Sequence, residues 1–195
     1  MLRMREQLVS VCGAGALGAN MAESLARSGF ARLRIIDRDR IEERNLSTQP
    51  FYRSDIGAHK AKILANSLYR ALGVSAEARA EELTHRNAGK LLDGLVIDAF
   101  DNSASREAVK AACLESGLPC LHVGLAEAYA EVIWNERYRV PSAALDDICD
   151  YPLARNLVTL TVAVACETLI KYLAEGRRES FTITLNDFAV NPFDA

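Results

Sequence analysis

Residues 8–37 decide the fold: they read LVSVC at 8–12, GAGALG at 13–18 and LRIID at 33–37, with helix-forming sequence between. The apolar run at 8–12 predicts a buried strand, and the glycines have the spacing G-x-G-x-x-G of a tight turn from a strand into a helix. Such glycines let the backbone approach phosphate groups, and the helix N-terminus offers free N–H groups to an anion. Asp37 follows about 20 residues later, at the spacing from which an acid reaches ribose hydroxyls. The order predicts a nucleotide-binding βαβ unit with Gly13, Gly15, Gly18 and Asp37 at the ligand.

The composition is that of an ordinary folded chain. The 195 residues are 50% hydrophobic and 25% charged, so we expect one domain over 1–195. The formal net charge of −3 provides no basic field for nucleic acid or for a membrane surface. The most apolar segment, 157–170, is shorter than the ~18 residues of a membrane span and contains Glu167. We therefore expect neither nucleic acid nor a membrane as a partner.

The cysteines form no recognisable framework. Their number is odd, and no two of them make a C-x-x-C pair, which argues against disulfides and against structural zinc. This usage favours a reducing, cytoplasmic compartment. The five are Cys12, Cys113, Cys120, Cys149 and Cys166.

Apolar runs alternate with helical periodicity along most of the chain. We expect strands at 8–12, 32–37, 74–80, 94–98, 119–123, 128–134 and 181–185, and helices at 16–28, 57–72, 87–92, 103–116 and 152–175. The strand at 128–134 alternates in polarity and is expected at an edge, and Ser103 or Ser105 is expected to cap the helix that begins there. This order predicts an α/β fold: a Rossmann-like, doubly wound, mainly parallel sheet with antiparallel strands at its C-terminal end.

Three polar stretches meet where such a sheet binds ligands, outside the carboxyl ends of its strands. They are the glycine turn, the long loop at 37–60, and the turn after the strand at 94–98. The loop reads DRDRIEERNLSTQPF at 37–51, followed by GAHKAK at 57–62, and the turn reads DAFDN at 98–102. Long loops of this kind are often functional.

With the glycine turn, these stretches resemble the ThiF/MoeB/ubiquitin-activating adenylation family. That family has the patterns D-x-D-x-[VI]-E-x-x-N-L-x-R-Q, G-x-x-K-A and D-x-x-D-N, and each occurs here in order except for the arginine. The resemblance covers residues 6–134, and the length suggests the short ThiF-like branch. It implies an adenylyltransferase in which a carboxylate attacks the α-phosphorus of ATP, giving acyl-AMP and pyrophosphate. The carboxylate would be the C-terminus of a ubiquitin-like sulfur-carrier protein or a small carboxylic acid.

The resemblance also implies roles for individual residues. Asp37 would hold the ribose, while Asp39 and Asn45 would shape the nucleotide site. Lys60 would contact the phosphates as a point charge, and Asp101 would bind Mg²⁺. The catalytic set would be Lys60, Asp101 and Asn45, and further nucleotide contacts are expected from Gln49 and Asn102.

One departure from the family pattern lies at Thr48, where relatives have an arginine. Threonine carries no charge for developing phosphate negativity, so another arginine is expected to replace it. Arg44 and Arg53 are the nearest candidates in the sequence, and Arg3 or Arg5 of a partner chain would come next.

Cys149 is a second open point, because relatives that form covalent sulfur links carry a cysteine in this region. Its aspartate neighbours disfavour a thiolate. A homodimer is also expected, since residues 157–165 are apolar around most of a helix and one sheet covers only one side.

Two other functions remain open at this stage. The glycine turn and Asp37 also suit an NAD-binding oxidoreductase with a minimal Rossmann domain. The missing arginine also allows a catalytically reduced, nucleotide-binding partner subunit.

Overall fold

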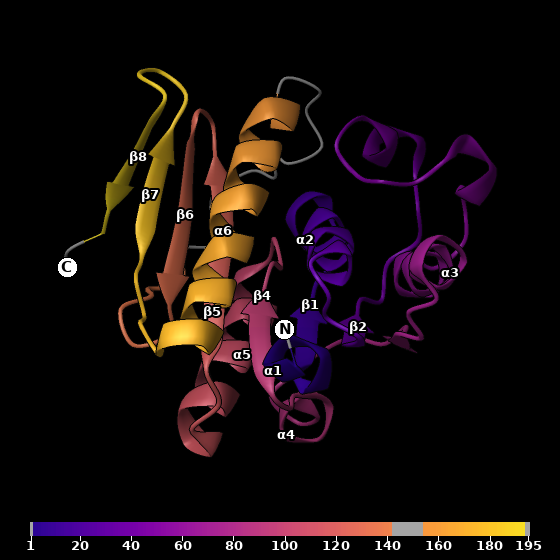
Figure 1. Cartoon of the computed structure of the whole chain (residues 1–195). Coiled ribbons are helices and arrows are strands. Elements are labelled where there is room, and N and C mark those ends of the chain that lie inside the picture. Colours follow the sequence, from indigo (N-terminus) through magenta and orange to yellow (C-terminus); the bar gives the residue numbers. More distant parts are fainter. Residues whose placement is uncertain (1, 142–153, 194–195) are drawn as a thin grey trace.

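The computed structural model describes residues 2–141 and 154–193. One eight-stranded sheet organises these residues, in the spatial order β3-β2-β1-β4-β5-β6-β7-β8. The strands from β3 to β5 are parallel, and those from β5 to β8 pair antiparallel, as the sequence predicted. The strands are β1 (Leu8–Cys12), β2 (Arg32–Ile36), β3 (Glu77–Arg79), β4 (Leu95–Asp98), β5 (Cys120–Ala126), β6 (Tyr129–Trp134), β7 (Phe181–Thr184) and β8 (Ala189–Pro192) (Figure 1).

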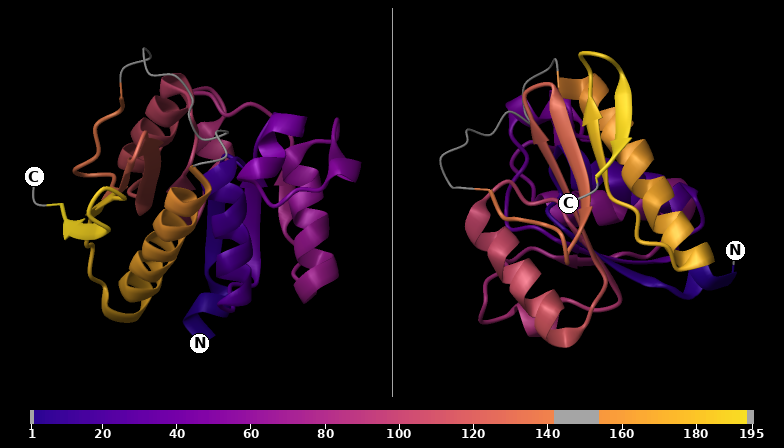
Figure 2. Two further views of the ribbon diagram at one scale, coloured as in Figure 1. Left: turned by 90° about the horizontal axis from the view of Figure 1, so that it is seen from above. Right: turned by 90° about the vertical axis from the view of Figure 1, so that its left-hand side faces the viewer.

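Helices cover both faces of this sheet. Figure 2 shows α5 on one side of the strands and α2 and α6 on the other, which is the layering of a doubly wound fold. Two short 3₁₀ helices, η1 (Glu43–Ser47) and η2 (Arg53–Asp55), lie in the long loop after β2. The α-helices are α1 (Leu2–Glu6), α2 (Ala16–Arg27), α3 (Lys60–Leu72), α4 (Ala88–Leu91), α5 (Ser103–Ser116) and α6 (Arg155–Glu175).

The core has two parts because the sheet separates them. The larger part joins α2, α3 and α6 to one face, with residues such as Leu25, Leu64 and Leu169 fully or almost fully buried. The smaller part joins α4 and α5 to the other face around Val96 and Val109. All four residues of β4 are buried, as expected of a central parallel strand.

α6 is, in the described part of the chain, the one helix long and apolar enough to cross a membrane. It packs along α2 and against β5 and β6 instead of lying alone. Its buried side chains include Leu157, Val158 and Val162, whereas Thr159 and Ala163 are exposed. The protein's own sheet and α2 therefore cover more of this helix than the sequence reasoning assumed.

Several expected boundaries were wrong. The strand expected at an edge, β6, lies between β5 and β7, because the later hairpin pairs with it and extends the sheet. β8 and α1 were missed, since neither has a clear apolar periodicity. The helix expected from 57 begins at Lys60, because Gly57 has a φ of +88° and the chain at 59 still bridges to Arg40.

The cap of α5 also differs from the prediction. Asn102, not Ser103 or Ser105, is the N-cap residue: its side-chain oxygen accepts a hydrogen bond from the Ser105 N–H at 2.9 Å. Asparagine is as good a cap as serine, and the helix starts one residue after it.

Candidate active site

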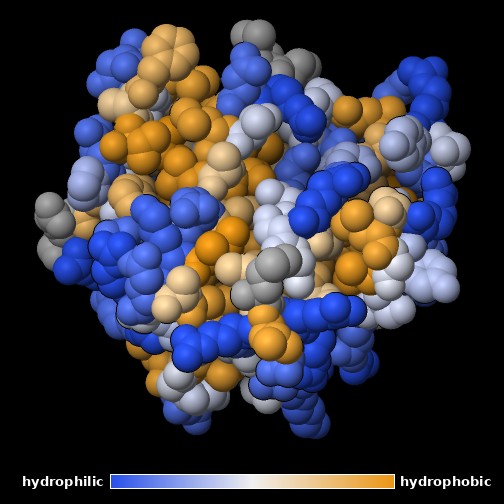
Figure 3. Space-filling view, in the orientation of Figure 1, coloured by the Kyte–Doolittle hydropathy of each residue, from blue (hydrophilic) through white to orange (hydrophobic). Residues whose placement is uncertain are grey.

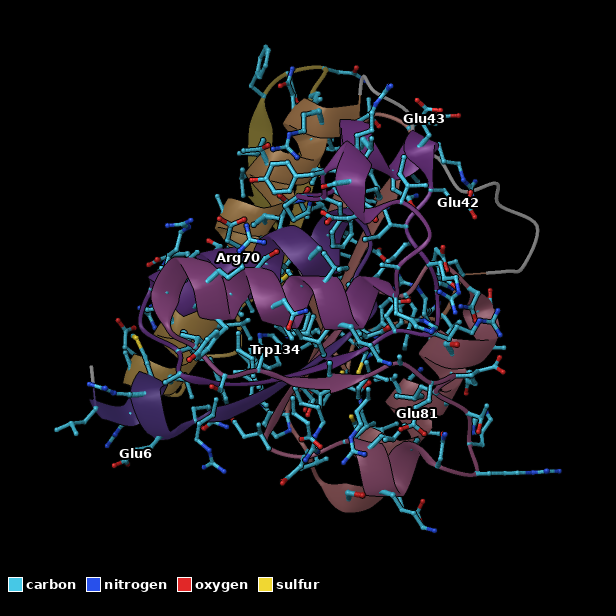
Figure 4. The ribbon with its side chains drawn as sticks, turned by 90° about the vertical axis from the view of Figure 1, so that its right-hand side faces the viewer. Glu6, Glu42, Glu43, Arg70, Glu81 and Trp134 are labelled. Carbon is cyan, nitrogen blue, oxygen red and sulfur yellow. The ribbon has the colours of Figure 1, made fainter. Side chains whose placement is uncertain are left out.

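A cavity of about 670 Å³ lies at the carboxyl ends of the parallel strands. Its walls come from the glycine turn after β1, the loop after β2, residues 81–83, the turn after β4, and β5 with β6. In Figure 4, Glu81 lies on the side of this cavity, and Glu6, which precedes β1, lies at the opposite end of the molecule. The three stretches expected to converge therefore do so.

The glycine turn forms one wall because it has no side chains there. Gly13 has a φ of +93°, and a Cβ on it would lie 2.8 Å from the carbonyl oxygen of Ala99. Gly15 also lines the cavity. Gly18 does not line it: a Cβ at this position would collide with the Gly13 carbonyl. The third glycine thus lets α2 pack closely on the turn, and the first two leave room for a ligand.

Asp37 holds the glycine turn in place. Its Oδ2 accepts a hydrogen bond from the Ala14 N–H at 2.6 Å, and its Oδ1 accepts one from the Asp39 N–H at 2.7 Å. Burial raises the pKa of Asp37, while these N–H groups and the Lys60 ammonium act in the opposite direction. Each oxygen keeps a second lone pair that can accept a ligand hydroxyl. Asp37 therefore fixes the glycine turn through hydrogen bonds and also lines the cavity.

Lys60 brings a positive charge to the same cavity. It begins α3 with its side chain only 10% exposed, and its Nζ lies 3.7 Å from Oδ2 of Asp39. A lysine at a helix N-terminus is unfavourably placed against the helix dipole. The helix dipole therefore does not explain why a buried lysine stands here. An anion bound beside the glycine turn does explain it, because the ammonium would face that anion.

The turn after β4 places two polar residues at the cavity. Asp101 is exposed and Asn102 caps α5, and both line the cavity. The side-chain amide nitrogen of Asn102 lies 3.4 Å from Oδ1 of Asp101. The Asp101 carboxylate keeps most of its acceptor capacity for a cation or a ligand.

The residues expected from the long loop divide into two groups. Asp39 and Gln49 line the cavity, but Asn45 does not. Asn45 is buried, and its Oδ1 accepts the Glu42 N–H at 2.8 Å. This bond closes the first turn of η1, so the side chain orders the loop instead of facing the cavity.

Thr48, at the position of the family's arginine, is fully buried. Its hydroxyl has no hydrogen-bond partner within the described ranges. Its carbonyl oxygen accepts hydrogen bonds at 2.8 Å from Asn20 and from Arg155 of α6. The position faces the interior and not the cavity.

The two candidate replacement arginines have different surroundings. Arg44 lines the cavity and pairs with Glu42 at 2.8 Å. Arg53 pairs with Glu43 at 2.9 Å and is outside the cavity wall. Arg3 lies on α1 and contacts the Leu173 carbonyl at 3.4 Å, at the amino-terminal edge of the sheet. Within one chain, Arg44 is the better placed replacement.

A buried polar cluster beneath the cavity was missed by the sequence reasoning. Arg106 of α5 is buried, lies 3.7 Å from Asp98 Oδ2, and donates to the Val123 carbonyl at 2.9 Å and to the Tyr138 hydroxyl at 2.7 Å. Burial alone would raise the pKa of Asp98, but Arg106 and His122 outweigh it and hold that pKa below its ordinary value. An aspartate inside a parallel strand was the one available signal, because such a buried charge needs partners.

His122 joins this cluster through both of its ring nitrogens. Its Nδ1 lies 2.7 Å from Asp98 Oδ2, and its Nε2 lies 2.6 Å from Asn135 Oδ1. The Asn135 amide nitrogen donates to the Lys110 carbonyl at 3.2 Å, which fixes its oxygen toward the histidine. Both ring nitrogens therefore lie within hydrogen-bond distance of side-chain oxygens. The Tyr138 ring stacks on it at 3.8 Å.

The described cysteines are buried thiols. Burial raises the pKa of Cys166 to about 11, and it also raises those of Cys12 and Cys120. Such thiols are poor nucleophiles at neutral pH. Cys149, the candidate for a covalent role, lies outside the described residues.

No group of three or more ligating side chains suited to a metal occurs in residues 2–141 and 154–193. Magnesium needs less than this, because it is commonly held by one or two carboxylates together with substrate phosphates and water. Asp39 and Asp101 both line the cavity and fit that requirement.

Comparison with known proteins agrees with this geometry. The model of the ThiF family matches residues 1–180. A sulfur carrier protein adenylyltransferase of Thermus thermophilus is 36% identical over 122 residues, which are 60% of this chain and 45% of that protein. The sulfur carrier protein ThiS adenylyltransferase of Bacillus subtilis is 29% identical over 133 residues, 65% of this chain and 40% of that protein. The chain thus spans less than half the length of these two relatives.

Solved structures share the fold at low sequence identity. The crystal structure of E. coli MccB with MccA-N7isoASN has a TM-score of 0.82 and 16% identity, covering 98% of this chain and 65% of that one. E. coli MccB with ATP has a TM-score of 0.80 and 16% identity, covering 98% and 64%. Likeness at this identity establishes the architecture alone. Because the family model matches nearly the whole sequence, the chain belongs to the ThiF family.

Proposed function

We propose that this protein uses ATP to adenylate a carboxylate, releasing pyrophosphate and forming an acyl-adenylate. The observation that carries the proposal is the cavity: Gly13, Asp37, Lys60 and Asp101 come from four separate segments and line one space. An NAD-dependent dehydrogenase needs the first two, but it has no evident use for a buried lysine and an exposed aspartate beside the phosphate-binding turn. The names of the relatives support adenylation.

Each residue has a distinct part in this proposal. Asp37 accepts hydrogen bonds from ribose hydroxyls with the lone pairs that the turn leaves free. The backbone of the glycine turn and Lys60 face the phosphates, where positive charge and fixed N–H dipoles stabilise negative charge that develops in the transition state. Asp101, with Asp39, would hold Mg²⁺, which supplies further charge neutralisation at the phosphates.

The chemistry is a displacement at phosphorus. A carboxylate oxygen of the substrate bonds to the α-phosphorus, and the bond from that phosphorus to the bridging oxygen breaks, so that pyrophosphate leaves. No proton moves in this step, because the attacking carboxylate is already ionised. The protein's contribution is to hold the two reactants in line and to balance the charge.

The acyl substrate is proposed to be the C-terminus of a small sulfur-carrier protein, with a small carboxylic acid as the second possibility. Two of the relatives are named for activity on sulfur carriers. We also propose a cytoplasmic location, from the cysteine usage.

ATP–pyrophosphate exchange tests the proposal. The purified protein should incorporate labelled pyrophosphate into ATP when it is incubated with ATP, Mg²⁺ and the right carboxylate. Thermal unfolding with ATP–Mg²⁺ should show stabilisation, and NAD⁺ should give none. Stabilisation by NAD⁺ alone would favour the oxidoreductase, and ATP binding without exchange for any carboxylate would favour a catalytically reduced subunit.

A homodimer is proposed from the surface of α6. Figure 3 shows apolar atoms gathered in the upper left of the view, where Figure 1 places β7 and the upper part of α6. Leu160, Val164 and Ile170 of α6 are only partly buried, and Ala163 is exposed. Contiguous apolar surface of this kind favours association. Sedimentation equilibrium should give twice the chain mass of 21.4 kDa, and a single-chain mass at tens of micromolar would contradict the dimer.

A further inference from the structure

The cavity has a second end, away from the nucleotide-binding residues. Asp37 follows β2, whereas Gly124 lies on β5 and Glu131 on β6, three and four strands further along the sheet. At a strand spacing of about 4.8 Å, these are separations of roughly 14 and 19 Å. A nucleotide anchored at Asp37 and the glycine turn leaves the β5–β6 end of the cavity to the acyl substrate.

Glu131 is the charged side chain that β6 contributes to this end. It pairs across the strands with Gly124, and its Oε1 lies 3.3 Å from the point where a Cβ on Gly124 would stand. Arg106 Nη2 lies 3.6 Å from the same point. The absence of a side chain at 124 therefore lets the carboxylate lie against the strand, close to the guanidinium.

The Glu131 carboxylate has unused acceptor capacity. No residue in the described part of the chain donates a hydrogen bond to it, although it is half-buried. Burial raises its pKa, and Arg106 and His122 act in the opposite direction. Its other titratable neighbours are Tyr129 and Tyr138. A desolvated carboxylate in a cavity wall is stabilised when a ligand donates to it.

The charges around Glu131 indicate what kind of donor fits. Arg106 already supplies a positive charge beside this carboxylate. A cationic group from the substrate would have to lose its water beside that guanidinium, and burying a second cation there is costly. A neutral N–H satisfies the carboxylate without bringing a further charge into the cavity wall.

We propose that Glu131 is a specificity-determining residue that accepts a hydrogen bond from a main-chain N–H near the carboxyl end of the acyl substrate. Arg106 is a positioning residue: Val123, Tyr138 and Asp98 fix its guanidinium, which holds the Glu131 carboxylate over Gly124. This inference rests on the proposed adenylation. It favours a peptide terminus over a small acid without an amide.

The test combines substrate and protein changes in ATP–pyrophosphate exchange. The probes are a pool of synthetic peptides with free C-terminal carboxylates and two matched pools, in which the last or the last-but-one amide is replaced by an ester. One ester pool should raise the KM of the wild-type protein by about 10- to 100-fold, the value of one hydrogen bond to a charged acceptor. Glu131→Leu should raise the KM for the amide pool similarly and should not distinguish amide from ester, because the two changes remove the same bond.

Three controls separate specificity from structure. Glu131→Gln keeps an oxygen acceptor and should recover part of the loss. Glu127→Gln makes the same change at an exposed position outside the cavity and should have no effect on KM. Gly124→Ala should give an intermediate KM, because the Cβ displaces the carboxylate. The ATP affinity should be unchanged in all of them.

The outcomes distinguish this inference from the proposed function. If both ester pools affect wild type and Glu131→Leu equally, or if only small acids without amides support exchange, the inference is overturned and adenylation stands. If no carboxylate supports exchange, the proposed function fails and the inference falls with it.

Discussion

Replacing Asp37 should damage both the fold and the nucleotide site, because the structure gives this carboxylate two tasks. It accepts the N–H groups of Ala14 and Asp39 at 2.6 and 2.7 Å while it is 5% exposed. A hydrogen bond to a charged group contributes about 1.5–3 kcal/mol, so losing both in Asp37→Ala should lower the free energy of unfolding by roughly 3–6 kcal/mol. In a domain of this size, that corresponds to a fall in Tm of about 6–24 °C.

The same change should weaken ATP binding by about 10- to 100-fold, through the lost ribose contact. Asp37→Asn should lower the free energy of unfolding by about half as much as Asp37→Ala, since its amide has one oxygen for two N–H donors. Asp101→Ala is the matched control. This carboxylate is exposed and its side-chain contact is with the neighbouring Asn102, so the free energy of unfolding should be unchanged. Urea unfolding and calorimetric ATP titration measure the two effects. An Asp37→Ala protein with unaltered stability and ATP affinity would refute the reasoning.

Five further variants test the rest of the site. Lys60→Ala and Asp101→Ala should each lower the rate of pyrophosphate exchange by about 10²–10³-fold, as groups that stabilise transferring phosphate do, and near-normal rates in both would remove them from the mechanism. Arg44→Ala should lower the exchange rate while keeping ATP binding, whereas Arg53→Ala, outside the cavity, should not; a loss only in the second would reverse the assignment. Asp98→Asn should lower the free energy of unfolding by about 3–5 kcal/mol at pH 7, because it leaves the buried Arg106 guanidinium without its charged partner. Because the pKa of this aspartate is depressed in the folded protein, its stabilisation is fully present above the unfolded pKa of about 3.9 and is lost as the pH falls from there through the folded value, so the difference in urea unfolding between Asp98→Asn and wild type should shrink steadily as the pH is lowered below about 3.9.

The parts predicted well from the sequence are those encoded over short stretches. The apolar run, glycine turn and Asp37 stand within thirty residues, and their local spacing alone predicts the βαβ unit. β4 was found for a similar reason, since a continuous apolar run leaves few alternatives. The convergence of the long loop and the turn after β4 followed from topology, because parallel strands bring their carboxyl ends together.

The parts that escaped prediction depend on contacts between distant segments. Asn45 has the family's position, yet its side chain closes η1, a difference that only the folded loop reveals. β8 pairs with β7 through backbone groups, so its side chains carry little pattern. Neither outcome can be read from periodicity, because both are decided by which neighbour satisfies a backbone group.

The charged cluster under the cavity shows why an active site cannot be read from its motifs alone. Arg106 and Glu131 come from different elements and share no motif, yet each limits where the other can lie, through the space left by Gly124. Arg106 lies 3.7 Å from Asp98 and also acts on the pKa of Glu131, so one guanidinium serves both carboxylates. Removing any one of these charges would change the field at the acyl end of the cavity without touching the nucleotide end. On the proposed function, we therefore expect substrate selectivity and ATP binding to be separable, so that variants at one end of the cavity change one property and leave the other unchanged.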